Sequence, residues 1–159
     1  MYRKLEDFVQ DWEKNCAGTL SIIESITEEK KNVSIVEGHS SLEWLSWHLT
    51  TAPAYFCGLA GLNLELDLNP ANTPATINEI KEAYKAVSQK VVEVAKNNLS
   101  DEKLLTNADM HGQATPIGAI LRLFVDHQTH HRAQMQVLLR QAGLNVPGVM
   151  GPTKEMRSK

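Results

Sequence analysis

Residues 115–143, TPIGAILRLFVDHQTHHRAQMQVLLRQAG, predict the longest helix of this 159-residue chain. Its apolar residues recur at steps of three and four positions, which places them on one face of a helix. They are Ile117, Ile120, Leu121, Phe124, Met135, Leu138 and Leu139. Thr115 is the expected N-cap, Pro116 the first helical residue, and Gly143 lies just past the end. The stretch therefore predicts an amphipathic helix that packs against other helices.

Three further segments have the same spacing of apolar residues. We expect these helices at about residues 2–27, 40–58 and 76–98. Two of them open with the spacing of a capping box, formed by Ser40 with Glu43 and by Thr76 with Glu79. In the second helix, Pro53 removes one backbone hydrogen bond because its ring nitrogen carries no hydrogen.

The connections between these helices are long, at residues 28–39, 62–75 and 99–114, with one helical turn expected at 101–105. We find no alternating run of β-branched residues that would favour a sheet. The predicted fold class is therefore all-α, a four-helix bundle with long crossover connections. We expect a single domain over residues 1–146 and a tail over residues 147–159 draped on the surface.

Composition excludes several classes of function. The formal net charge is -3, and no run of basic residues exceeds the pair Lys30 and Lys31, so we expect no nucleic-acid partner. Residues 1–10 contain no apolar signal region, and no stretch approaches the ~18 uninterrupted apolar residues of a membrane span. We therefore expect a cytoplasmic protein with no membrane partner. Cys16 and Cys57 form no CxxC pair and are expected to pack as small apolar residues.

Three of the six histidines are predicted to converge on one divalent metal ion. His127 and His131 lie four residues apart near the apolar stripe of the last helix, so their rings are close enough to bind one ion. His48 is the other histidine on an inward-facing stripe, in the second helix. Three imidazoles suit zinc, nickel, iron or copper, and they leave a coordination position open, as in catalytic sites. The competing interpretation is that each ring packs in the core with its own hydrogen-bond partner.

The other histidines are assigned to the surface. His39 precedes a helix cap, His111 lies in a loop beside a glycine, and His130 points away from the apolar stripe. His111 is kept open as a fourth ligand. A ferritin-type dinuclear site is disfavoured, since it needs ExxH steps on two helices and the sequence contains none. Gln128 and Gln134 are near enough in sequence to hold the ligating rings, whereas Asp126 falls on the outward side.

The segment DHQTHHRAQ at residues 126–134, with TPIGAILRLFV before it and MQVLLRQAGL after it, resembles the fourth-helix signature of the DinB-like superfamily. SLEWLSWHL at residues 41–49 is similar to the second-helix motif of that family. The resemblance covers about residues 1–146. Family members commonly have glycine at the positions of Gln128 and Ala133, so the pocket wall here differs from the common pattern.

The resemblance implies a left-handed bundle, often a homodimer, that carries zinc, nickel or a similar ion on three histidines. Carried over residue by residue, those ligands are His48, His127 and His131, the trio that helical phase selects on its own. Relatives include enzymes that use low-molecular-weight thiols, such as S-transferases and maleylpyruvate isomerase.

Our leading functional hypothesis is a metal-dependent enzyme that activates a small thiol or a water, as a thiol S-transferase or a hydrolase. One alternative is a non-catalytic bundle that binds a metal or small ligand in stress response. A third is a dimeric interaction module in which the histidines are incidental. Trp44 and Trp47 are candidates to cover its interface, although packing of these rings within one chain is the favoured interpretation.

Overall fold

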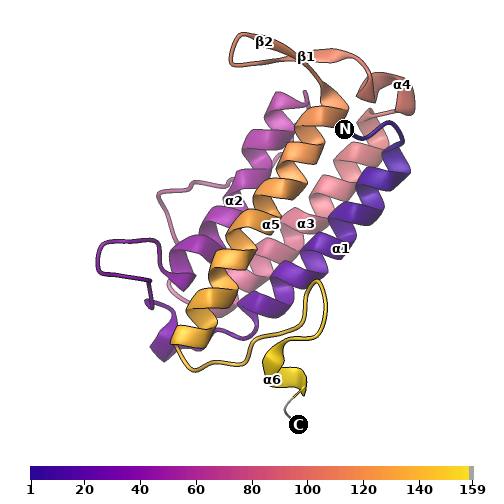
Figure 1. The fold of residues 1–159 in the computed structure, drawn as a ribbon. Coiled ribbons are helices and arrows are strands. Elements are labelled where there is room, and N and C mark those ends of the chain that lie inside the picture. Colours follow the sequence, from indigo (N-terminus) through magenta and orange to yellow (C-terminus); the bar gives the residue numbers. More distant parts are fainter. Residues whose placement is uncertain (158–159) are drawn as a thin grey trace.

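The computed structural model describes residues 1–157 and contains four long helices that pack side by side (Figure 1). They are α1 (Leu5–Ile23), α2 (Leu42–Leu59), α3 (Ile77–Asn98) and α5 (Ile117–Gln141). Both α1 and α2 pack against α3 and α5, so α1 and α2 lie on opposite corners of the bundle. The predicted all-α four-helix bundle is confirmed.

The connection between α2 and α3, residues 60–76, runs along the bundle. The carbonyl of Asn69, in the middle of this connection, accepts a hydrogen bond of 3.2 Å from Nε1 of Trp47 near the start of α2. The ends of α2 and α3 both lie near the hairpin end of the molecule (Figure 1). These two neighbouring helices therefore run in the same direction, and the long connection is the crossover that this arrangement requires.

Aromatic rings occupy the middle of the core between α1, α2 and α5. The ring of Phe124 lies 4.3 Å from that of Trp12 and 5.1 Å from that of Phe56, measured between centroids. Trp12 and Phe124 are fully buried. Phe56 also contacts His127, which places the histidine cluster against one edge of this core.

The first helix is shorter than predicted, Leu5–Ile23 rather than residues 2–27. Its N-cap, Lys4, offers no side-chain acceptor. Instead, the carboxylate of Asp101 accepts from the backbone N–H of Leu5 at 2.9 Å and from Nζ of Lys4 at 2.8 Å. A side chain 96 residues away in sequence thus satisfies the start of the helix.

The two predicted capping boxes have different outcomes. The box of Thr76 and Glu79 is confirmed, with both reciprocal hydrogen bonds present. At α2 the N-cap is Ser41 and not Ser40: its hydroxyl accepts from the backbone N–H of Trp44 at 3.1 Å. The carboxylate of Glu43 pairs instead with Lys31 at 2.8 Å, in the connection that contains the 3₁₀ helix η1 (Glu28–Lys30).

Residues 99–116 hold more regular structure than the predicted loop. The expected helical turn is present as α4 (Asp101–Leu104), and an antiparallel hairpin follows, with β1 (Asn107–Met110) pairing to β2 (Gln113–Pro116). The prediction of Thr115 as N-cap and Pro116 as first helical residue was wrong, because both belong to β2 and the helix begins at Ile117. Gly143 does follow the end of α5, with a φ of 70°.

The described part of the tail, residues 147–157, lies on the bundle. The carbonyl of Pro147 accepts from the side chain of Gln136 at 3.0 Å, and Arg140 pairs with Glu155 of the short helix α6 (Lys154–Arg157) at 2.8 Å. The tail is therefore draped over α5, as expected, and the rest of the predicted tail, residues 158–159, lies outside the described residues. Among residues 1–157, no helix is long and apolar enough to cross a membrane.

Candidate metal centre

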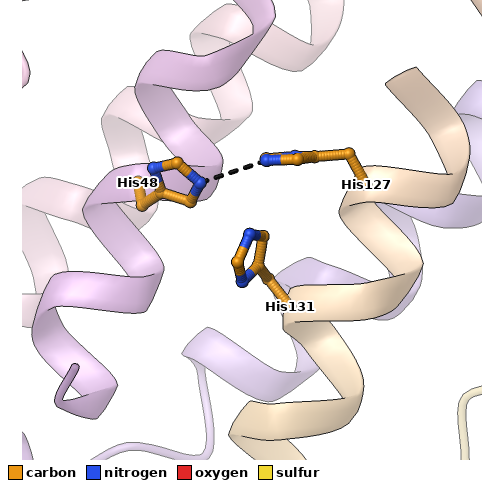
Figure 2. A group of neighbouring side chains, drawn as sticks. All are labelled: His48, His127 and His131. Carbon is orange, nitrogen blue, oxygen red and sulfur yellow. Dashed lines mark hydrogen bonds between the residues drawn. The ribbon is translucent and has the colours of Figure 1, made fainter. Parts of the chain in front are cut away.

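The structure brings the three predicted histidines together between α2 and α5. His48 comes from α2, and His127 and His131 lie one turn apart on α5 (Figure 2). One ring nitrogen of each residue lies within 4.8 Å of one ring nitrogen of each of the other two. All three side chains are half-buried. The rings point toward one another, so the cluster presents three imidazole donors to one small volume (Figure 2).

The spacing of the nitrogens fits a single ion. Nε2 of His48 lies 3.2 Å from Nε2 of His127. Two nitrogens bound to one tetrahedral zinc at 2.0–2.1 Å would lie about 3.3 Å apart. Carboxylates are not part of this group. A set of three neutral nitrogen donors suits zinc, nickel or iron better than magnesium or calcium.

His127 has a buried ring nitrogen without a partner. Its Nε2 faces His48, and its Nδ1 is buried with no hydrogen-bond partner in the described structure. A lone imidazole in this position would leave one nitrogen unsatisfied in either neutral tautomer, which costs about 1–3 kcal/mol. A cation at Nε2 would leave Nδ1 unpaired, so this atom argues only against the interpretation in which each ring packs with its own hydrogen-bond partner.

Burial and the neighbouring rings favour the neutral forms of His127 and His48. Desolvation by burial, followed by the charges of His131, His48 and His130, lowers the pKa of His127 from 6.5 to about 4. Desolvation and the charge of His131 also lower the pKa of His48. Neutral imidazole is the form that binds a metal, because the proton and the ion compete for the same lone pair.

Gln134 holds the ring of His131. Its side-chain carbonyl Oε1 lies 2.8 Å from Nδ1 of His131, and its amide Nε2 lies 3.3 Å from Nε2 of His130. An amide carbonyl can only accept, so Nδ1 of His131 carries the hydrogen and Nε2 keeps its lone pair. Gln134, which the sequence placed near enough to the predicted ligands, thus contacts one of the three rings, and such a contact is usual around metal ligands.

Aromatic side chains fix the other two rings. Trp44 stacks on His48 with ring centroids 4.9 Å apart and 9° between the planes. Phe56 packs against His127 at 5.1 Å. Packing of Trp44 and Trp47 within the chain was the favoured interpretation of the sequence, and Trp47 is buried, but the stack of Trp44 on His48 was not predicted. The four-residue step from Trp44 to His48 is the signal that could have found it.

Gln128 does not hold an imidazole, contrary to the prediction. Its amide Nε2 donates to the carbonyl of Leu49 at 3.0 Å, and its Oε1 accepts from the hydroxyl of Tyr84 at 3.1 Å. The carbonyl of Leu49 is four residues before Pro53, so it is the one that the proline leaves without a helical donor. Gln128 therefore joins α2, α3 and α5 and satisfies the backbone group freed by Pro53.

The remaining histidines lie outside the three-histidine group. Nε2 of His111, at the turn of the hairpin with a φ of 55°, lies 2.7 Å from the hydroxyl of Tyr55. His39 is exposed in the connection before α2, and His130 is an exposed neighbour of Gln134. His111 is not a member of the group, so the structure does not bring it in as a fourth ligand.

The two cysteines are buried and free. Cys57 is fully buried, and desolvation raises the pKa of its thiol to about 12. Desolvation also raises the pKa of Cys16 to about 11. Both thiols are thus protonated near neutral pH, and neither belongs to the histidine group.

Comparison with known proteins agrees with this fold. The sequence profile of the DinB family matches residues 1–158. The chain belongs to the DinB family. This DinB protein is 31% identical over 159 residues to the uncharacterised protein YrdA of Bacillus subtilis (strain 168), an alignment that covers 100% of this chain and 95% of YrdA.

Solved structures resemble this DinB protein over nearly their whole length. A DinB-like protein from Bacillus cereus ATCC 10987 superposes with a TM-score of 0.88 at 34% identity, covering 93% of this chain and 99% of that one. The DinB-like protein YjoA from Bacillus subtilis gives a TM-score of 0.71 at 21% identity, covering 92% and 99%, and at that identity it supports the fold alone. None of these three descriptions specifies a reaction.

Proposed function

We propose that this protein is a metal-dependent enzyme in which His48, His127 and His131 hold one divalent transition metal ion. Zinc and nickel are the first candidates, and iron is an alternative. The observation that carries the proposal is the convergence of three imidazoles from two helices, with one ring nitrogen of each within 4.8 Å of one ring nitrogen of the others. A bound ion would supply a Lewis acid that lowers the pKa of a small thiol or a water.

The side chains around the site favour a thiol over a water as the nucleophile. A hydroxide nucleophile in metallohydrolases is commonly assisted by a carboxylate base, such as the glutamate of HExxH sites. The three-histidine group contains no carboxylate, and its polar neighbour is the neutral amide of Gln134. A thiol is far more acidic than water and loses its proton to solvent without a dedicated base.

The proposed reaction is the transfer of a low-molecular-weight thiol to an electrophilic carbon. The S–H bond breaks and its proton goes to solvent, the sulfur forms a bond to the carbon, and the leaving group departs with its electron pair. In this scheme Gln134 keeps the lone pair of His131 Nε2 directed into the site, and Trp44 and Phe56 hold the other two rings. These contacts orient the donors before any ligand binds.

Cobalt-substituted protein offers a direct test. We expect 2-mercaptoethanol or L-cysteine to add a sulfur-to-cobalt charge-transfer band, and the loaded enzyme to accelerate conjugation of the thiol with 1-chloro-2,4-dinitrobenzene. His48→Ala should lose both effects. His39→Ala, which removes an exposed histidine outside the group, is the matched control and should retain both.

The alternatives give different outcomes of the same experiment. A thiol band without turnover of any electrophile would favour a non-catalytic bundle that sequesters metal or thiol. If cobalt is bound but neither the charge-transfer band nor turnover is seen, the proposal of a thiol transferase is wrong. The homodimer, the role in stress response and the cytoplasmic location stay predictions from the sequence.

A further inference from the structure

Arg132 is a buried cation on a different side of α5 from the histidines. Its side chain is 3% exposed and lies between α1 and α5, where Nη1 donates to the carbonyl of Asn15 at 2.9 Å. Gly18 of α1 makes room for the side chain of Val149 in the tail, because a Cβ at that position would clash with its Cγ1. The guanidinium of Arg132 lies next to the same glycine, so the tail and α1 enclose it together.

The hydrogen bonds of Arg132 do not neutralise its charge. Besides the carbonyl of Asn15, its partner is the hydroxyl of Thr129 at 3.5 Å, a long contact. Among residues 1–157, no carboxylate forms an ion pair with Arg132. A buried charge without a counter-ion is costly, and arginine is a residue that proteins use to bind oxyanions in a bidentate way.

A polar pocket of about 190 Å³ borders Arg132. Asn15, Thr129 and Arg132 form part of its lining, Lys14 adds a second cation, and Val149 of the tail covers one side. In the described chain Lys14 makes no hydrogen bond or ion pair, so its ammonium group is available to a ligand.

The two carboxylates of this pocket are already bound. Asp126 accepts from Nε of Arg122 at 3.1 Å, and Asp11 accepts from the hydroxyl of Tyr2 at 2.9 Å. Nη1 of Arg122 also lies 4.0 Å from Asp11. Arg122 is therefore engaged by the carboxylates. The lining holds three cations and two carboxylates, so one positive charge is in excess, and Lys14 and Arg132 are its cations without an ion pair in the described chain.

We propose that this pocket is a binding site for a small oxyanion, a phosphate or a carboxylate group, held by the Arg132 guanidinium and the Lys14 ammonium. The oxyanion supplies the counter-charge that the described chain does not provide. The site is separate from the metal centre, because it lies between α1 and α5 whereas the histidines lie between α2 and α5.

Thermal unfolding at constant ionic strength tests this proposal, with sodium phosphate, sodium sulfate or sodium acetate replacing sodium chloride. We expect at least one of these anions to raise the Tm of the wild type in a saturable way. Lys14→Met should weaken the binding of that anion by roughly tenfold, because one charge-assisted hydrogen bond contributes about that much to affinity. Lys96→Met, at an exposed lysine on α3, should leave the response unchanged.

Arg132→Met separates a ligand site from a purely structural arginine. It should abolish the response, and without oxyanion it should be at least as stable as the wild type, because it removes an uncompensated buried charge. Saturation by phosphate or sulfate identifies a phosphate-type ligand, and saturation by acetate alone identifies a carboxylate.

Two results would contradict the proposed oxyanion site. One is a wild-type Tm that none of the three anions raises above the chloride reference. The other is an equal rise in the wild type and in Lys14→Met, because salting-out anions stabilise many proteins without binding. If Arg132→Met does not fold, the comparison of Lys14→Met with Lys96→Met still decides the outcome.

Discussion

Two consecutive residues of α5, His127 and Gln128, place polar groups in the bundle with opposite results. Gln128 is fully buried, and both ends of its amide are used, by the hydroxyl of Tyr84 and the carbonyl of Leu49. His127 meets a second imidazole on one side and leaves a buried nitrogen unpaired on the other.

The difference separates a structural polar group from a candidate ligand site. Where the chain supplies every partner, as around Gln128, the hydrogen bonds join helices and need nothing from outside. Where three imidazoles converge, as around His127, and Gln134 pairs with only one of them, the arrangement favours an added cation. If this comparison is correct, changes at the two places should affect different measured quantities.

The largest expected effect is stabilisation by metal. Zinc at 1,000 times its Kd should raise the free energy of unfolding of the wild type by about 4 kcal/mol, since it binds the folded state alone. His131→Ala should lose nearly all of this gain, because two imidazoles remain of three. Urea unfolding with and without zinc measures it. An equal gain in His131→Ala would place the ion elsewhere.

Gln128→Leu should lower stability without removing metal. The variant leaves the carbonyl of Leu49 and the hydroxyl of Tyr84 without their partner, which should cost about 2–4 kcal/mol. Tyr84→Phe, which removes one hydroxyl, should cost less. The measurement is urea unfolding of the metal-free proteins beside zinc content at saturation. A Gln128→Leu protein that folds as stably as the wild type contradicts the structural role.

Replacing Gln134 should change the affinity for zinc rather than the free energy of unfolding. Gln134→Leu removes the acceptor of His131 Nδ1 and should weaken zinc binding by about 10- to 100-fold. Gln134→Glu keeps an acceptor oxygen and should retain tight binding. Competition with a chromophoric chelator gives both affinities. Equal losses in the two variants would show that packing, and not the hydrogen bond, explains the contact.

The smallest expected effect is a dependence of metal-free stability on pH. The folded pKa of His127 is about 4, below the ordinary 6.5, so its neutral ring contributes stability fully above pH 6.5 and loses it as the pH falls from 6.5 toward 4. The ring is partly exposed, and solvent screening keeps the effect small. Urea midpoints at pH 7.5 and pH 5 should differ less in His127→Gln than in the wild type.

Helical periodicity was sufficient to predict the bundle and the meeting of three histidines. His127 and His131 share a face by spacing alone, and the inward stripe of the second helix selected His48. The contact of Gln134 with His131 was within reach because it spans only three residues.

Contacts between distant segments explain what the sequence could not predict. The start of α1 depends on Asp101, and the partner of Gln128 is a carbonyl that Pro53 frees on another helix. The sequence predicted Ser40 as the cap of α2, whereas the cap is Ser41 and Glu43 pairs with Lys31. Such choices rest on tertiary contacts that no local pattern contains.

Metal analysis of untagged protein tests the central claim most directly. The wild type and His127→Ala should be purified side by side, loaded with zinc or nickel, freed of excess metal and measured at known protein concentration. We predict about one metal ion per chain in the wild type and little in His127→Ala, with both proteins folded. No metal in either protein, or equal metal in both, would contradict a metal centre at these three histidines.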